Sequence, residues 1–166
     1  SNPVLMIIMT FLIILGGLGW VLLVDVFRQR RISRFSLETK MVLVYSILLW
    51  TLGAGVLYLA EFANSNTMGD FSWVDKIMGA IFQSVSGRTA GFLVVDFGEV
   101  KDVTKSTFSG LMFIGGAAGS VAGGIKVATF AVLMAAVISS LRGRPHAEAF
   151  GREIHQSQLH RALTVA

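Results

Sequence analysis

The residues of this chain that could do chemistry through their backbone form a short run of small and polar residues, Ser86–Phe92. The run contains two glycines, Gly87 and Gly91, and no carboxylate. Extended backbone of this composition can line up carbonyl oxygens that replace the hydration shell of a cation. Such a site requires small residues rather than acidic side chains, because its ligands are main-chain oxygens. We therefore expect extended backbone here, with cation-binding carbonyls at four residues: Arg88, Thr89, Ala90 and Gly91.

The same run carries one full charge, on Arg88. The simple alternative for this segment is an ordinary exterior turn, but a charge at membrane depth is costly and is normally functional. A guanidinium that faced the cation would repel it, so we interpret Arg88 as a structural donor. It is predicted to brace the cation-binding backbone or to pair with an acidic group.

A second run of small residues follows later in the chain and ends at a lysine. Its members are Gly115, Gly116, Gly119, Ser120, Gly123, Gly124 and Lys126. The spacing of four also fits a straight helix that packs through small residues, which is the alternative. Because the surrounding apolar segment is nearly twice as long as one membrane span, we favour a break that forms a loop inside the membrane. A nucleotide-binding loop is discounted, since Ile125 interrupts the Gly-Lys pair that it needs.

The composition indicates a membrane protein. Hydrophobic residues make up 54% of the 166 residues and charged residues 14%, with a mean hydropathy of +0.69. An ordinary soluble domain carries about a quarter charged residues. The basic residues behind the net charge of +4 lie at the ends of apolar segments, so no nucleic-acid partner is expected. Cysteine is absent, which excludes a thiolate metal site. The start lacks a signal peptide, and both ends suggest part of a longer polypeptide.

Several apolar segments are available to position the two runs of small residues. They are two spans, Val4–Val24 and Met41–Ala60, a short helix, Trp73–Val85, and a broken helix with halves at Ser106–Ile114 and Val127–Leu141. The short helix cannot span a bilayer, and with the strand after it resembles a re-entrant pore loop. Basic segments at Phe27–Lys40 and Arg142–Arg161 should be cytoplasmic. The sequence therefore predicts an all-α membrane protein with the order helix, pore loop, helix (M1-P-M2), whose last helix is broken by a glycine-rich loop.

Two motifs on this framework resemble the Trk/Ktr/HKT superfamily of potassium transporters. The family's third repeat typically carries Ser-x-Arg-Thr-Ala-Gly-Phe, which Ser86–Phe92 matches, and a Gly-Gly-x-x-Gly-Ser-x-x-Gly-Gly-Ile-Lys stretch, which Gly115–Lys126 matches. The resemblance covers essentially the whole chain. It implies the end of a second repeat at 1–40, the third repeat at 41–141, and a cytoplasmic linker with the start of a fourth repeat at 142–166. One departure is that Leu93 and Val94 follow the motif where the family usually has a polar pair.

The resemblance implies potassium uptake through a pore of four covalently linked repeats in the bacterial cytoplasmic membrane. Backbone of Arg88–Gly91 would contribute to the selectivity filter, the only place where potassium binds. Gly115–Gly124 would form an intramembrane gate loop below it. The implied partners are the remaining repeats, a second copy of the protein, membrane lipid and a cytosolic ring of nucleotide-binding subunits, for which Phe27–Lys40 and Arg142–Arg161 are candidate contacts. No cofactor and no enzymatic activity are expected.

Other interpretations stay open at this point. The chain could belong to a membrane scaffold or sensor with a non-conducting pore loop, or to a sodium-permeable member of the same superfamily. An intramembrane enzyme is disfavoured, because the apolar segments offer no Ser/His or paired-Asp constellation. Two roles remain for Lys126: its amine could reach the inner membrane surface, or it could act as an electrostatic gate near the inner mouth of the pore.

Overall fold

The computed structural model describes residues 3–29, 31–120, 122–143, 146–154 and 156–165. Arg30, Val121 and Arg144, which belong to segments discussed above, lie outside these residues. The described part is mainly helical, which confirms the predicted fold class. Its elements, in chain order, are α1 (Pro3–Leu18), α2 (Trp20–Gln29), a short 3-10 turn (Ile32–Arg34), α3 (Leu37–Glu61), α4 (Trp73–Thr89), α5 (Asp102–Phe113), α6 (Val127–Leu141), strands β1 (Glu148–Ala149) and β2 (Arg152–Glu153), and α7 (Gln156–Val165).

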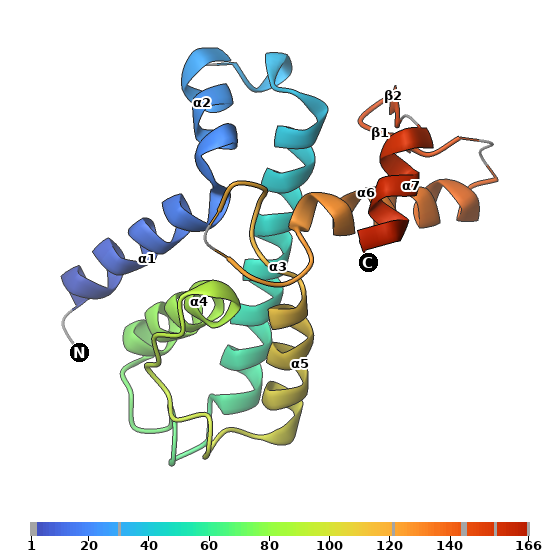
Figure 1. Ribbon diagram of the computed structural model, residues 1–166. Coiled ribbons are helices and arrows are strands. Elements are labelled where there is room, and N and C mark those ends of the chain that lie inside the picture. The colour runs from blue at the N-terminus through green and yellow to red at the C-terminus, as the bar shows by residue number, and fades with distance from the viewer. Residues whose placement is uncertain (1–2, 30, 121, 144–145, 155, 166) are drawn as a thin grey trace.

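Helix α3 is the axis of the molecule (Figure 1). Its 25 residues extend over about 38 Å at 1.5 Å per residue. Among the described residues it is the one helix that is long and apolar enough to cross a membrane by itself. Its N-terminus is capped by Ser36, whose side-chain oxygen accepts a hydrogen bond from the Thr39 amide at 3.1 Å. The predicted span Met41–Ala60 lies entirely within α3 and is confirmed.

The first predicted span, Val4–Val24, contains Gly16, Gly17 and Gly19, which suggest a kink, and the structure has a full break there between α1 and α2. The chain bends by 95° between α1 and α2, at Gly19. This glycine has a φ of +74°, a left-handed conformation that side chains disfavour and that ends an α-helix. The two helices together pass the length and apolarity criteria for a span, so they form either a broken span or a re-entrant segment.

Helix α4 lies across α3 and packs against α1, α3 and α5. Ala80 of α4 belongs to a core cluster with residues of α3, α5 and the loops, whose buried members are Leu57, Met68, Ala80, Val95, Val100 and Phe108. Because the three helices share this core, α4 is held at a fixed place beside α3 and α5. The order helix, short helix, helix predicted from the sequence is present.

The last predicted helix is broken, as expected. Helix α5 ends at Phe113, α6 begins at Val127, and none of the described residues between them is helical. A straight helix that packs through small residues is thereby excluded. Beyond α6 the chain forms a small antiparallel hairpin of β1 and β2, and α7 then packs back against α6 (Figure 1).

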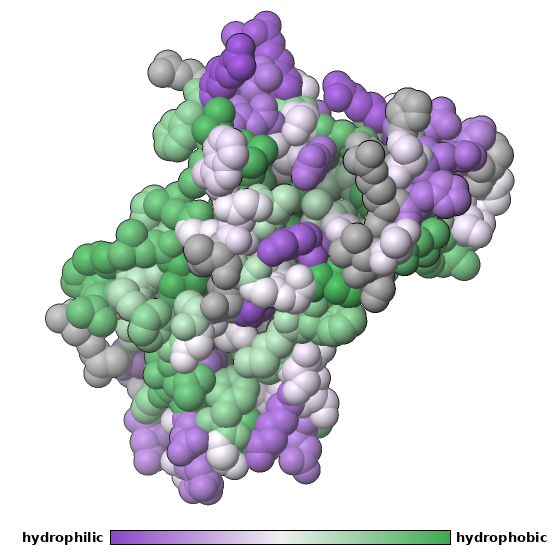
Figure 2. All heavy atoms as spheres, viewed as in Figure 1, coloured by the Kyte–Doolittle hydropathy of each residue, from purple (hydrophilic) through white to green (hydrophobic). Residues whose placement is uncertain are grey.

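Hydrophobic residues cover the middle of the molecule on the face shown in Figure 2, and hydrophilic residues gather toward its two ends. Helix α1 contributes much of the exposed apolar surface, through Val4, Leu5, Ile7, Ile8, Phe11 and Leu12, each more than half exposed. Apolar surface of this extent is suited to contact with lipid or with other membrane segments.

A fully buried carboxylate, Glu61, ties the end of α3 to the start of α5. Its side chain is 0% exposed. One carboxylate oxygen accepts hydrogen bonds from the Thr104 hydroxyl at 2.6 Å and the Lys101 amide at 2.9 Å. The other accepts from the Asn64 side-chain amide at 2.6 Å and the Thr67 hydroxyl at 3.0 Å. A buried acidic group is tolerated when its oxygens are satisfied in this way, so Glu61 fixes the loops at this end of the molecule.

We predict that Glu61→Gln lowers the free energy of unfolding of the full-length protein by about 1–3 kcal/mol, because the NH2 of the new amide would face either the Lys101 amide or the Asn64 side-chain NH2, which can only donate. Thermal unfolding of the detergent-solubilised protein measures this loss. The matched control is Glu99→Gln, an exposed acidic residue in the same group of loops. Equal melting temperatures for the two variants would contradict the structural role of Glu61.

Candidate functional site

The residues predicted to bind a cation lie at the C-terminal end of α4. The expectation that extended backbone begins at Ser86 is wrong, because α4 continues to Thr89. The Ala90 and Gly91 amides both donate to the Ser86 carbonyl, at 2.8 and 3.1 Å, and so complete the last turn. Gly91 then turns the chain out of the helix with a φ of +72°. A glycine in this conformation just past the last helical turn is a common helix stop.

Of the four predicted residues, Arg88 and Thr89 are therefore helical, Ala90 is the C-cap, and non-helical backbone starts at Gly91. The space around Gly91 is open, since a Cβ atom added there would meet no atom within 4 Å. The C-terminus of a helix carries a partial negative charge from its aligned peptide dipoles. The end of α4 is thus electrostatically suited to a cation even though no carboxylate is part of the motif.

Arg88 is almost completely buried, with 7% of its surface exposed. Its Nη2 donates to the Gly115 carbonyl at 2.7 Å and to the Ile114 carbonyl at 3.2 Å, and its Nε donates to the same Ile114 oxygen at 3.3 Å. The guanidinium was expected to brace the cation-binding backbone or to pair with an acidic group. Instead, its acceptors are the first two carbonyls of the glycine-rich loop. Arg88 therefore joins the end of α4 to the loop between α5 and α6.

The base of this loop is closed by main-chain hydrogen bonds. Ile114 and Ile125 form a parallel bridge, in which the Gly115 amide donates to the Ile125 carbonyl at 2.8 Å and the Ile125 amide donates to the Phe113 carbonyl at 3.0 Å. The Val127 amide donates to the Gly116 carbonyl at 3.1 Å. The two chain segments at the base lie so close that a Cβ atom at Gly115 would collide with the Gly123 carbonyl oxygen. This contact explains the requirement for glycine at position 115.

Within the loop, two side chains bond back to the main chain. The Ser120 hydroxyl donates to the Ala117 carbonyl at 2.7 Å, and the Lys126 amine donates to the Ala122 carbonyl at 2.7 Å. Lys126 is half-buried and its amine faces the loop. All seven predicted loop residues, Gly115, Gly116, Gly119, Ser120, Gly123, Gly124 and Lys126, are brought together in this one non-helical segment.

The tip of the loop rests on the bend between α1 and α2. The Ala117 amide donates to the Gly17 carbonyl at 3.0 Å. A Cβ atom at Gly19 would lie 2.6 Å from the Ala118 carbonyl oxygen, and one at Gly119 would lie 3.0 Å from the indole nitrogen of Trp20. Glycines on both sides thus permit a close approach of two backbones. Gly19, the glycine at the bend, therefore also serves this contact.

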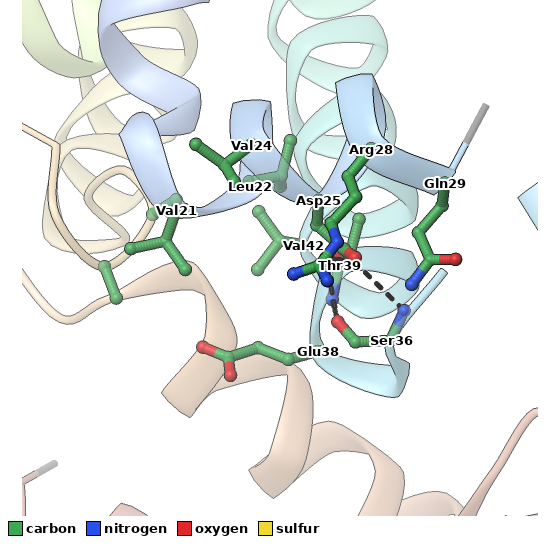
Figure 3. A pocket seen from close by; sticks show the side chains of 12 residues that line it. Val21, Leu22, Val24, Asp25, Arg28, Gln29, Ser36, Glu38, Thr39 and Val42 are labelled. Carbon is green, nitrogen blue, oxygen red and sulfur yellow. Dashed lines mark hydrogen bonds between the residues drawn. The ribbon is translucent and has the colours of Figure 1, made fainter. Parts of the chain in front are cut away.

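A cavity of about 290 Å³ lies beside the loop, between α2 and the start of α3 (Figure 3). Ala117 and Ala118 line one side of it, and the other side carries polar groups of α2 and α3. Among these, Asp25 accepts hydrogen bonds from the Ser36 amide at 3.1 Å and the Thr39 hydroxyl at 2.6 Å. The carboxylate of Asp25 therefore ties α2 to the N-terminus of α3, next to the loop.

The whole chain, residues 1–166, matches the family described as TrkH, cation transport protein. The chain belongs to the TrkH cation transport family. It is 38% identical over its full length to the Ktr system potassium uptake protein B of Bacillus subtilis, of which it covers 37%. It is 33% identical to the potassium/sodium uptake protein NtpJ of Enterococcus hirae, with 99% of this chain and 36% of that protein covered. The chain thus spans a little over a third of these relatives.

The structure of this chain also resembles a solved structure of the same family. The structure matches the crystal structure of the potassium transporter TrkH from Vibrio parahaemolyticus with a TM-score of 0.75 and 20% sequence identity, over 99% of this chain and 36% of that one. At this identity the match concerns the fold alone. Proteins of this family are integral proteins of the bacterial cytoplasmic membrane, and so is this chain.

Neither Glu61 nor Gln83 was predicted to have a role, yet both are fully buried polar groups. A signal existed for Gln83, since a polar residue with apolar neighbours on a helix is expected to have a specific partner. The target of Arg88 had no sequence signal, because its acceptors are main-chain carbonyls 26 and 27 positions away.

We predict that Gly115→Ala destabilises the full-length protein by about 1–3 kcal/mol, because the added methyl group forces the base of the loop apart. The measurement is thermal unfolding in detergent. Gly123→Ala is the matched control, since a Cβ atom at Gly123 would meet nothing within 4 Å. If the Gly123 variant lost as much stability as the Gly115 variant, the described loop conformation would be wrong.

Proposed function

We propose that the full-length protein takes up potassium through a pore to which this chain contributes the end of α4 and the glycine-rich loop. The observation that carries the proposal is the contact between them: Arg88, the first residue of the proposed cation-binding segment, donates to the carbonyls of Ile114 and Gly115, where the loop begins. A backbone filter and a nearby loop that can close the passage are the two parts that cation permeation needs. The start of the loop contacts the proposed filter segment, so the loop is placed to control the flow of cations.

The proposed filter differs slightly from the one expected from sequence. The backbone of Arg88–Gly91 remains our proposal for this chain's part of it. Because Arg88 and Thr89 are helical, their carbonyls belong to the last turn of α4, and Gly91 begins the non-helical part. The helix dipole then adds to the attraction of these carbonyls for a cation. Potassium would be the substrate, no cofactor would be needed, and no covalent bond would be made or broken.

Gly115–Gly124 is the proposed gate. Its contacts with Arg88 and Gly17 hold it in one conformation, and the cavity beside Ala117 and Ala118 offers space into which it can move. Lys126 is turned onto the loop, which favours a role in loop conformation over contact with the inner membrane surface. The division of the chain into the end of a second repeat (1–40), a third repeat (41–141) and a linker (142–166) remains a prediction.

The partners are proposals as well. We propose a homodimer whose subunits each contain four repeats and contact a cytosolic ring of nucleotide-binding subunits. The support from this structure is that Arg28, in the last turn of α2, is exposed and lines the cavity beside the gate, and that Arg34 is exposed on the turn between α2 and α3. A partner that moved α2 would act on the loop through the bend at Gly19. A sodium-permeable protein is the second candidate, favoured by the similarity to the protein named for potassium/sodium uptake.

The experiment is rubidium-tracer uptake by the full-length protein in a potassium-uptake-deficient bacterial strain, with Gly91→Asp as the test variant. The added carboxylate would trap a cation or block the passage, so we expect uptake to fall to the background of the empty strain. Gly151→Asp is the matched control, because Gly151 has nearly the same φ, +71°, equally open surroundings, and a place in the distant hairpin.

The outcomes separate the alternatives. Loss of uptake in the Gly91 variant alone, at equal membrane abundance, supports a conducting filter at this position. Unchanged uptake would overturn the filter assignment. An absence of uptake by the unmodified protein under all conditions would favour the scaffold or sensor. Faster uptake of sodium than of rubidium would favour the sodium-permeable alternative.

A further inference from the structure

We propose that Gln83 and Ser86 are positioning residues that set the cation selectivity of the filter, by clamping the extended segment after Gly91 onto α4. This inference rests on the proposed function and goes beyond it, since neither side chain belongs to the cation-binding backbone. Gln83 and Ser86 are three positions apart, so they lie on the same face of α4. Both are 0% exposed.

Each of the two side chains holds one main-chain group of the segment. The Ser86 hydroxyl donates to the Phe92 carbonyl at 2.6 Å. The side-chain oxygen of Gln83 accepts from the Val94 amide at 2.8 Å. The identity of this amide oxygen is fixed by its partner, because a backbone N–H can only donate. The segment is therefore bound to α4 at two alternate residues, through one carbonyl and one amide.

The side chains of the segment supply little anchoring of their own. Phe92 is 50% exposed and Leu93 is 61% exposed, and the first fully buried side chain after Gly91 is Val95, at 2%. Leu93 and Val94 also cannot form side-chain hydrogen bonds, whereas the superfamily usually has a polar pair there. Between Gly91 and Val95, the position of the backbone thus depends on the two hydrogen bonds from α4.

Gln83 carries a further sign of a specific role. Its side-chain nitrogen is buried and has no hydrogen-bond partner among the described residues. An unpaired buried donor is destabilising, so methionine or leucine would fill the same space at lower cost. Glutamine at this position is explained if the acceptor that it offers to Val94 is required. A residue that only packed the core would not need the amide.

Fixed carbonyl positions matter for discrimination between cations. A filter distinguishes potassium from sodium by the number, spacing and stiffness of the oxygens that replace the hydration shell. The Phe92 carbonyl is committed to Ser86, and this fixes the peptide group between Phe92 and Leu93, next to the Gly91 region. Release of the segment from α4 would let the Gly91 region adapt to a smaller ion. We therefore expect loss of the clamp to change selectivity more than it changes folding.

The test measures rubidium and sodium uptake by the full-length protein in the same cells, for Gln83→Met and Ser86→Ala. Both variants remove a hydrogen-bonding group and keep an apolar body of similar or smaller size. We expect each to lower the rubidium-to-sodium uptake ratio by about 2- to 10-fold, the equivalent of one neutral hydrogen bond. Ser86→Thr keeps the hydroxyl that donates to the Phe92 carbonyl, so its ratio should stay within about twofold of the unmodified protein.

Thr104→Val is the control for a general loss of stability. Thr104 is also fully buried, but its hydroxyl bonds to Glu61, in the cluster at the end of α3. This variant should lower membrane abundance and leave the ratio unchanged. The clamp is overturned if the ratio is unchanged in Gln83→Met and Ser86→Ala while both conduct. If Gln83→Met does not reach the membrane, the ratio of Ser86→Ala decides by itself. An absence of any uptake by the unmodified protein would overturn the proposed function and the clamp together.

Discussion

The structure depends most on one interaction, the hydrogen bonds from the buried guanidinium of Arg88 to the Ile114 and Gly115 carbonyls. A buried charge is costly unless it is well bonded, and here main-chain oxygens take the place of a carboxylate. The interaction joins two parts of the chain that no hydrophobic pattern connects: the end of α4, where the cation-binding backbone begins, and the first residues of the glycine-rich loop. The position of one constrains the position of the other.

This arrangement explains why glycines are needed at the base and the tip of the loop. Arg88 holds the loop against α4, and the two backbone segments at the base of the loop pass close together. A side chain at position 115 would therefore collide with the Gly123 carbonyl. The tip then meets the bend at Gly19, where again only hydrogen fits between two backbones. The loop is thereby attached at its start, its base and its tip, while the cavity beside Ala117 remains open. Such a loop has one well-held conformation and room for another, which is what a gate requires.

The sequence predicted the parts of the fold that depend on local pattern. The predicted span within α3 and the predicted start of α6 at Val127 are confirmed. The break before α6 was predicted from the glycines and from an apolar segment that is nearly twice as long as one membrane span. The bend at Gly19 was underestimated, because three glycines in an apolar run do not reveal which one adopts a left-handed conformation. The end of α4 was set too early, since small polar residues fit a last helical turn as well as a strand. The contacts of Arg88, Glu61 and Gln83 join residues distant in sequence, and no local pattern encodes them.

The most direct test of the link between Arg88 and the loop is basal rubidium flux into proteoliposomes that hold the full-length protein alone. If Arg88 keeps the loop closed, Arg88→Met, which keeps an unbranched aliphatic side chain and loses every donor, should raise the flux several-fold at equal protein incorporation. Arg88→Lys, which retains a single donor group, should lie between the two. A flux for Arg88→Met equal to or below that of the unmodified protein would contradict the account.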